Sequence, residues 1–160
     1  MIATVAGPLG GLSAAEVARI LDHAEATANV TRSAIRLPLG SRTRMVIAVA
    51  DLDGTVIGLR RMPDATVFSI DVAVTKARNM VYFNSGPRTA TDFFPGSTGL
   101  YRNGTLVGGL GVSGDGVDED DYAANGGTAG FEALAAIRAD QVLDEGARLP
   151  YFKFPRNPTN

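Results

Sequence analysis

Several side chains in this 160-residue sequence are of the types that bind and convert small anionic molecules. Arginine and lysine donate charge-assisted hydrogen bonds to carboxylates, hydroxyl groups orient a substrate or a water molecule, and a carboxylic acid can move protons. The candidate cations are Arg60, Lys76 and Arg78, the hydroxyl groups belong to Ser97, Thr98 and Ser113, and the acids are Asp51 and Asp120. We take Lys76, Asp120 and Ser113 as the candidate catalytic group.

Lys76 has two interpretations. It lies beside Arg78 within a predicted helix, and a lysine stem can pack on apolar surface while its ammonium group reaches a cleft. In the functional interpretation, this ammonium group binds an anionic ligand. The other candidate ligand-binding residues are Arg60, Arg78, Phe94, Gly96, Ser97 and Thr98. In the structural interpretation, it forms an ion pair with an acid such as Asp71 or Asp120.

His23 is the only histidine and the candidate metal ligand. It lies off the apolar stripe of a predicted helix, which places it on the surface or at an interface. A histidine can ligate haem iron, and it titrates near neutral pH. The alternative is an ordinary solvated side chain.

Ser113 lies in the segment Gly109–Gly114, which matches GxGxxG. Dinucleotide binding also requires a parallel βαβ unit, whereas the flanking strands here are predicted to form a hairpin. A serine nucleophile is disfavoured because Asp115 replaces the last glycine of GxSxG and only His23 could serve as the base. We expect the glycines to permit close packing against a helix.

The acids that follow Ser113 could suggest a calcium site. Their spacing does not fit an EF-hand loop, since Val117 occupies the second ligand position counted from Asp115. Acids at a helix start are stabilised by roughly 0.3–1 kcal/mol each through the exposed N–H groups and the helix dipole. We interpret the cluster as a helix start, with an acid–arginine pair across an interface as an alternative.

The surrounding elements follow from turn signals and apolar periodicity. Asn103-Gly104 joins two short strands in a tight hairpin, and Gly108, Gly109, Gly111 and Gly114 let another group approach the second strand. A second hairpin joins strands at 45–50 and 55–61 through the Asp51–Gly54 turn. Because hairpins give antiparallel pairs, we predict an α+β fold.

Four helical segments are predicted. A capping box of Ser13 and Glu16 opens the first, which ends near Asn29. Asp64 is expected to cap a second helix over 65–83, with a buried stripe of Val67, Ile70, Val74, Ala77 and Val81. A third runs over 118–125, with a kink at 126–127, and a fourth covers 128–143. Residues 84–92 are expected to form a polar loop.

Length and composition indicate one domain over 1–160, with a flexible arm at 1–11 and an extended Pro/aromatic tail at 149–160. A formal net charge of −2 disfavours nucleic acid as a partner, and no apolar run is long enough to cross a membrane. No cysteine is present, which excludes disulfides and thiolate sites. The N-terminus lacks signal-peptide features, so the cytoplasm is the expected location.

Three blocks together resemble a known family: LSAAEVARILDHA, AVADLDGTVIGLRRMPDATVFSIDVAVTKARN and FPGSTGLYRNGTLVGGLGVSGDGVDEDD. The sequence is similar to the haem-binding and haem-degrading family typified by HbpS and GlcG, which includes the C-terminal domain of PduO-type corrinoid adenosyltransferases. The resemblance implies a profilin-like, five-stranded antiparallel sheet flanked by helices, assembled into dimers to octamers. Many relatives carry Gly-Gly-x-Pro after Phe-Pro, where this chain has Gly96-Ser97-Thr98-Gly99.

Two functional hypotheses follow. The first is a homo-oligomer that binds haem or a related tetrapyrrole, and possible axial ligands are His23, Lys76, Tyr101 or a methionine. The second is an enzyme that converts a small anionic metabolite by hydrolysis, tautomerisation or another proton transfer, in a pocket near Lys76 and the 94–99 loop. An accessory domain without chemistry is the third alternative.

Overall fold

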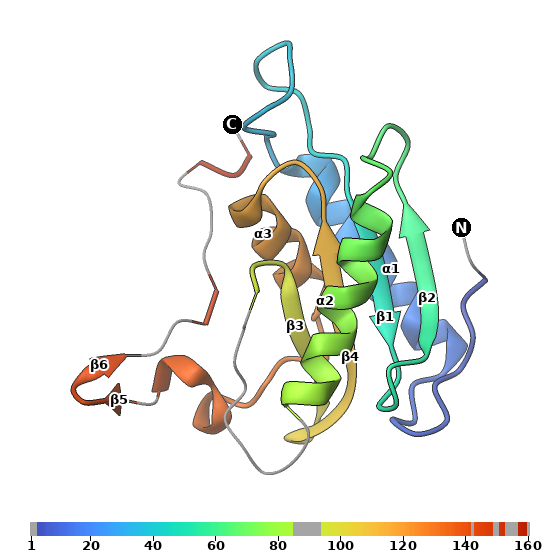
Figure 1. The fold of residues 1–160 in the computed structure, drawn as a ribbon, viewed down its shortest axis with the longest axis vertical. Helices are drawn as coiled ribbons and strands as arrows, with labels where there is room; N and C mark the ends of the chain where they lie inside the picture. The colour runs from blue at the N-terminus through green and yellow to red at the C-terminus, as the bar shows by residue number, and fades with distance from the viewer. Residues whose placement is uncertain (1–2, 85–93, 142, 149–150, 153–156, 160) are drawn as a thin grey trace.

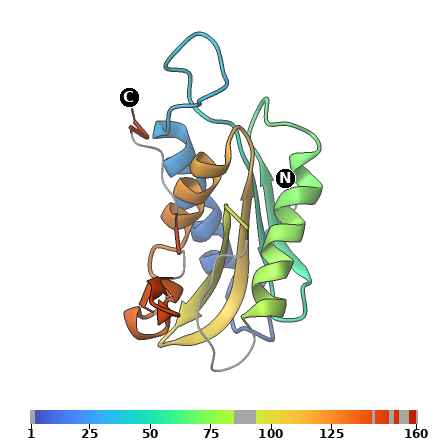
Figure 2. The ribbon, with the colours of Figure 1, turned by 60° about the vertical axis from the view of Figure 1, so that its left-hand side comes forward.

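One antiparallel sheet lies between two layers of helices (Figure 1). The computed structural model describes residues 3–84, 94–141, 143–148, 151–152 and 157–159. Helix α2 covers one face of the sheet, while helices α1 and α3 pack together on the other face (Figure 2). The predicted α+β class is confirmed.

Helix α1 spans Ala14–Val30 and begins where the capping box predicts. The Ser13 hydroxyl accepts a hydrogen bond from the Glu16 backbone N–H, and the Glu16 carboxylate accepts one from the Ser13 N–H. The predicted apolar stripe is buried, and it comprises Val17, Ile20, Leu21, Ala24 and Ala28.

The main sheet has the order β2-β1-β4-β3, so the two predicted hairpins lie side by side. Its strands are β1 (Val46–Ala50), β2 (Val56–Arg61), β3 (Ser97–Arg102) and β4 (Thr105–Ser113). The expectation of five strands is wrong for the described residues, where this sheet has four. The polar loop predicted over 84–92 lies almost wholly outside them.

Glycines in β4 allow helix α2 to lie directly on the sheet. A Cβ atom built on Gly109 would lie 2.1 Å from the carbonyl oxygen of Ala77, and one built on Gly111 would lie 2.1 Å from that of Ala73. Both separations are far inside van der Waals contact, so a side chain cannot be accommodated. The expected close packing against a helix is confirmed, and β4 pairs antiparallel with both of its neighbours.

Helix α2 spans Ser69–Phe83 and so begins later than predicted. The predicted cap at Asp64 is wrong, because this residue has a φ of 63° and its carboxylate pairs with Arg36 instead. Val67 therefore precedes the helix and is 69% exposed rather than part of a buried stripe. The buried residues of α2 are Ser69, Ala73, Lys76, Ala77, Met80 and Val81.

Helix α3 spans Val117–Gly127, and its glycine end packs closely on α1. A Cβ atom on Gly126 would lie 1.9 Å from the Thr27 hydroxyl oxygen, and one on Gly127 would lie 3.0 Å from Ala24 Cβ. The predicted helix over 128–143 is wrong. Among the described residues, that segment holds two 3-10 turns, η1 (Ala135–Ile137) and η2 (Ala139–Gln141), and Leu143 belongs to a short strand.

The remaining segments are short and extended. Strands β5 (Leu143–Asp144) and β6 (Ala147–Arg148) form a small hairpin. Near the N-terminus, Val5 N–H donates to the carbonyl of Ile57 and Gly7 pairs with Leu12, so the predicted arm is hydrogen-bonded at these points. None of the helices in the described part of the chain combines the length and apolarity needed to span a membrane.

Candidate functional site

Lys76 and Asp120 form a buried ion pair at the start of edge strand β3. The Nζ atom of Lys76 lies 2.8 Å from Asp120 Oδ2 and donates a second hydrogen bond, also 2.8 Å, to the carbonyl oxygen of Val112. Their side chains are only 5% and 6% exposed. Since α2 and α3 lie on opposite faces of the sheet (Figure 2), the pair joins the two helix layers around the sheet edge.

Gly96 lies directly over this ion pair. A Cβ atom at this position would lie 2.7 Å from Asp120 Cβ and 3.0 Å from Lys76 Nζ, and the backbone has a φ of 80°. The Gly96 N–H donates to Asp121 Oδ1, and its carbonyl accepts from the Val112 N–H. Space and backbone conformation therefore both favour glycine here. The structure thus brings together three predicted site residues: Lys76, Gly96 and Asp120.

The carboxyl group of Asp120 has an unusual environment. Burial raises its pKa to about 6, although the adjacent Lys76 charge acts in the opposite direction. Within the part of the chain that the structure describes, neither its buried Oδ1 atom nor the buried hydroxyl oxygen of Ser97 has a hydrogen-bond partner. A carboxyl group with a pKa near neutrality beside a cation has the chemistry needed for proton transfer.

The other predicted hydroxyl groups have different partners. Ser113 Oγ donates to Ser69 Oγ across 3.3 Å, and Ser69 Oγ lies 2.5 Å from Thr66 Oγ1. Thr98 Oγ1 donates a long bond of 3.4 Å to the carbonyl of Gly99. Ser113 is therefore bonded to a hydroxyl group rather than to a base, and no serine–histidine pair forms within the described residues.

The predicted cations Arg60 and Arg78 do not join Lys76. Arg60 Nη1 lies 2.6 Å from Asp22 and 2.8 Å from Glu25, both on α1. Arg78 Nε donates to the carbonyl of Gly54 in the β1–β2 turn, 2.8 Å away. Each arginine thus connects a helix to the first hairpin.

Two further candidates also lie outside the ion-pair cluster. Asp51 accepts hydrogen bonds from the backbone N–H groups of Leu9 and Gly10, at 3.0 and 2.7 Å, so its carboxylate holds the N-terminal turn. Phe94 is 55% exposed at the edge of the described residues.

Each of four acids near the start of α3 has its own hydrogen-bond or ion-pair partner, which the helix dipole alone does not explain. Asp115 pairs with Arg36, Glu119 accepts from the Ala34 N–H, Asp120 pairs with Lys76 and Asp121 accepts from the Gly96 N–H. All four acids are buried. A buried carboxylate needs a hydrogen-bond or ion-pair partner to offset its loss of solvation. The helix dipole would stabilise an exposed carboxylate as well, so it does not account for the burial of these four acids. The Lys76–Asp120 pair is one of the alternatives expected from the sequence, but the other three partners were missed because they come from distant segments.

His23 lies partly exposed on α1, as its position off the apolar stripe predicts. Its Nδ1 atom is buried and has no hydrogen-bond partner among the described residues. The described residues contain no group of three or more histidine, aspartate or glutamate side chains that could hold a metal ion. A metal centre at His23 would therefore use the imidazole alone, as a haem axial ligand does.

The chain is similar in sequence to known proteins. Residues 12–129 match the family model described as "Haem degrading protein HbpS-like". Two curated corrinoid adenosyltransferases named PduO, from Salmonella typhimurium and Citrobacter freundii, are 29% and 30% identical to the chain over 57% of its length. The match spans only a third (33%) of each of these relatives.

Solved structures give the same fold. A PduOC:haem complex has a TM-score of 0.60 and 25% identity, covering 77% of this chain and 96% of that one. An HbpS double mutant from Streptomyces reticuli has a TM-score of 0.58 and 23% identity, covering 74% and 85% of the two chains. Protein ORFY from Klebsiella pneumoniae has a TM-score of 0.58 and 22% identity, covering 75% and 90%. The last two support the fold alone.

Proposed function

Because the chain belongs to the HbpS-like family, we propose that it binds haem or a related tetrapyrrole as a homo-oligomer. The observation that carries this proposal is the combined sequence and fold similarity to a protein solved as a haem complex. Breakdown of the bound haem is a further part of the proposal, and the haem iron would supply its redox chemistry.

His23 is the side chain best suited to hold the iron. Haem iron is ordinarily held by His, Cys, Met or Tyr, and this chain has one histidine and no cysteine. Lys76 is used in its ion pair, which removes it as a ligand candidate. Since Nδ1 of His23 is buried, the partly exposed ring would offer its other nitrogen to the iron.

His23 is partly exposed on α1, so it would hold a haem at the protein surface. A second copy of the chain would shield such a haem from water. The homo-oligomer that the family resemblance implies, from dimer to octamer, is therefore part of this proposal.

Titration with hemin tests the proposal. We expect a Soret band to develop, and to shift and weaken in His23→Ala, because loss of an axial ligand changes the iron's ligand field. Asp22→Ala is the matched control and should keep the wild-type Soret position, because it removes the adjacent side chain, 62% exposed, and leaves the imidazole in place. Arg60 keeps its second partner, Glu25, in this control.

A flat hemin titration, or identical spectra for His23→Ala and the wild type, would refute the assignment. Loss of the Soret band after addition of ascorbate to the haem-loaded protein would support haem breakdown. A Soret band that persists under the same conditions would limit the function to haem binding.

A second function is favoured by the raised pKa of Asp120. We propose as the alternative that Lys76, Asp120 and Ser97 promote proton transfer on a small anionic metabolite near Gly96 and the start of β3. Turnover would require both members of the ion pair, so Lys76→Ala and Asp120→Asn should each abolish it. Unchanged turnover in both variants would eliminate this alternative.

A further inference from the structure

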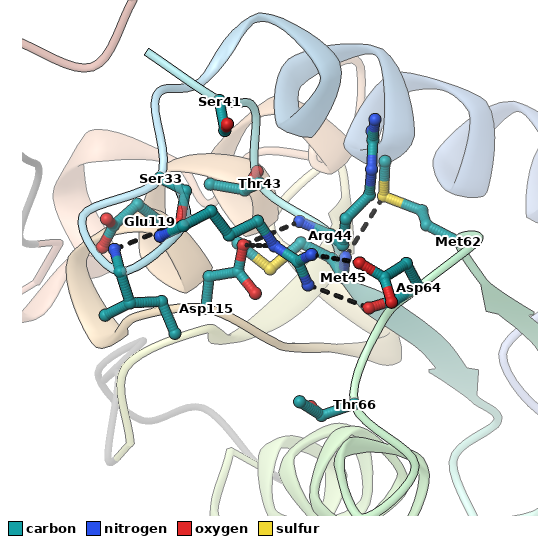
Figure 3. Close-up of polar contacts among 12 residues, drawn as sticks. Ser33, Ser41, Thr43, Arg44, Met45, Met62, Asp64, Thr66, Asp115 and Glu119 are labelled. Carbon is teal, nitrogen blue, oxygen red and sulfur yellow. Dashed lines mark hydrogen bonds and ion pairs between the residues drawn. The ribbon is translucent and has the colours of Figure 1, made fainter. Parts of the chain in front are cut away.

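An arginine-lined hollow lies at the end of the molecule where the 31–44 segment meets the connection between β2 and α2. Its volume is about 480 Å³, and its lining residues are Arg36, Leu37, Ser41, Arg42, Arg44 and Asp64. Figure 3 shows Ser41, Arg44, Asp64 and Asp115 gathered at this end of the fold. Three guanidinium groups therefore line the hollow together with the Asp64 carboxylate, and a second carboxylate, Asp115, contacts Arg36.

Arg36 is fixed as part of the wall. Its Nε donates to Asp115 Oδ2 and its Nη1 to Asp64 Oδ2, both at 2.5 Å, and its Nη2 donates to the Asp64 carbonyl at 2.9 Å. Asp115 is buried and Asp64 is exposed. These two carboxylates offset the charge of Arg36, so this residue orders the hollow rather than leaving a cation for a ligand.

Arg42 and Arg44 differ from Arg36 in that the hydrogen-bond acceptors of their guanidinium groups are neutral. Arg42 Nη1 donates to the carbonyls of Val30 and Thr159, at 3.0 and 2.6 Å, and Arg44 Nη1 donates to Asn29 Oδ1 at 3.1 Å. Within the described residues, neither guanidinium group pairs with a carboxylate. Their Nε and Nη2 atoms make no hydrogen bond there either. Neutral acceptors therefore orient two charged groups without offsetting their charge.

We propose that this hollow binds a phosphate-type oxyanion. Guanidinium groups donate paired hydrogen bonds that match phosphate oxygens, and two of them complement a double negative charge. Leu37, 82% exposed on the same lining, provides an apolar contact for an organic group attached to the phosphate. The ligand would be an organic phosphate, either a free metabolite or the headgroup of a lipid. This site is distinct from His23 and from the Lys76–Asp120 pair.

Titration of the isotope-labelled full chain with inorganic phosphate, followed by amide NMR, tests the proposal. We expect saturable shifts centred on 36–44 and 64. The double variant Arg42→Gln/Arg44→Gln should weaken binding about tenfold or more, since it removes both unpaired cations. Arg148→Gln, which removes one exposed charge elsewhere, is the control and should bind like the wild type. A circular-dichroism melt shows whether the double variant is folded.

Vesicles distinguish the two sources of phosphate. Co-sedimentation with phosphatidylcholine vesicles that contain phosphatidic acid, but not with pure phosphatidylcholine, would identify a lipid headgroup if it requires Arg42 and Arg44. Binding of inorganic phosphate alone would identify a free metabolite. The proposal is overturned if neither probe binds, or if the double variant binds as tightly as Arg148→Gln. Should the double variant fail to fold, Arg42→Gln alone must weaken binding for the proposal to stand.

Discussion

Lys76 and Asp120 come from helices on opposite faces of the sheet, and their charged atoms meet 2.8 Å apart at the sheet edge. Neither side chain reaches solvent to any useful extent. The desolvation cost of such a pair can match its Coulombic attraction, so the pair need not stabilise the fold relative to apolar residues. Removal of one member alone, however, should destabilise the fold, because it leaves the other charge buried without a partner.

Lys76→Met should lower the free energy of unfolding by about 3–5 kcal/mol, because it leaves a buried carboxylate without its cation. The double variant Lys76→Met/Asp120→Leu removes both charges and should regain most of that loss. Urea unfolding at neutral pH measures both values. If the double variant is as unstable as Lys76→Met, the packing of the lysine stem rather than the unpaired charge determines the cost.

Asp120 should titrate with a pKa of about 6 in the folded protein. The folded state then keeps a proton that the unfolded chain, with an ordinary value of 3.8, has already released. Stability should therefore fall as pH rises between about 4 and 6, with this group contributing about 3 kcal/mol. Asp120→Asn should abolish that contribution, whereas Asp71→Asn, at an exposed position, should leave it intact. Carbon-13 NMR of the carboxyl groups gives the pKa directly, and an ordinary value for Asp120 would contradict the expectation.

Local sequence patterns were sufficient to predict the first helix, both hairpins and the α+β class. The capping box of Ser13 and Glu16 and the turn at Asn103-Gly104 depend on residues adjacent in sequence, so their chemistry is visible there. The prediction that Asp64 caps a helix was wrong because aspartate is typical of both helix N-caps and turns, so the local sequence does not separate the two. Only its partner Arg36, 28 residues away in the sequence, distinguishes them.

The candidate site could be predicted only in part. Lys76 and Asp120 were selected by residue type, and the alternative that they pair with each other is what the structure shows. Arg60 and Arg78 could not be separated from Lys76 by residue type, since all three are cations that could bind an anion. Their different positions depend on which face of the sheet each contacts. The shape of the arginine hollow depends on long-range contacts, so it could not be predicted from the sequence.

Gly111→Ala should be among the most damaging single-methyl changes in the chain. The added Cβ atom would lie 2.1 Å from the Ala73 carbonyl oxygen, so α2 must move off the sheet, at a cost of about 3 kcal/mol or more. Gly40→Ala is the comparison, since no atom lies within 4 Å of its Cβ position and only its φ of 91° opposes the change. That strain costs about 1–2 kcal/mol. Thermal or urea unfolding ranks the two, and equal costs would show that α2 adjusts freely.

Arg36 contacts two carboxylates of opposite exposure, which allows a matched test of burial. The side chain of Asp115 is 1% exposed and that of Asp64 is 83% exposed, yet both lie 2.5 Å from the same guanidinium group. Asp64→Ala should cost less than about 1 kcal/mol, because water and salt already screen this pair. Asp115→Ala should cost about 3 kcal/mol or more, since it leaves the Arg36 Nε and the Arg44 N–H without their buried acceptor. Added salt should reduce the first cost and leave the second nearly unchanged. Similar costs for the two variants would mean that the 31–44 segment is held by other contacts, such as Glu119 to the Ala34 N–H.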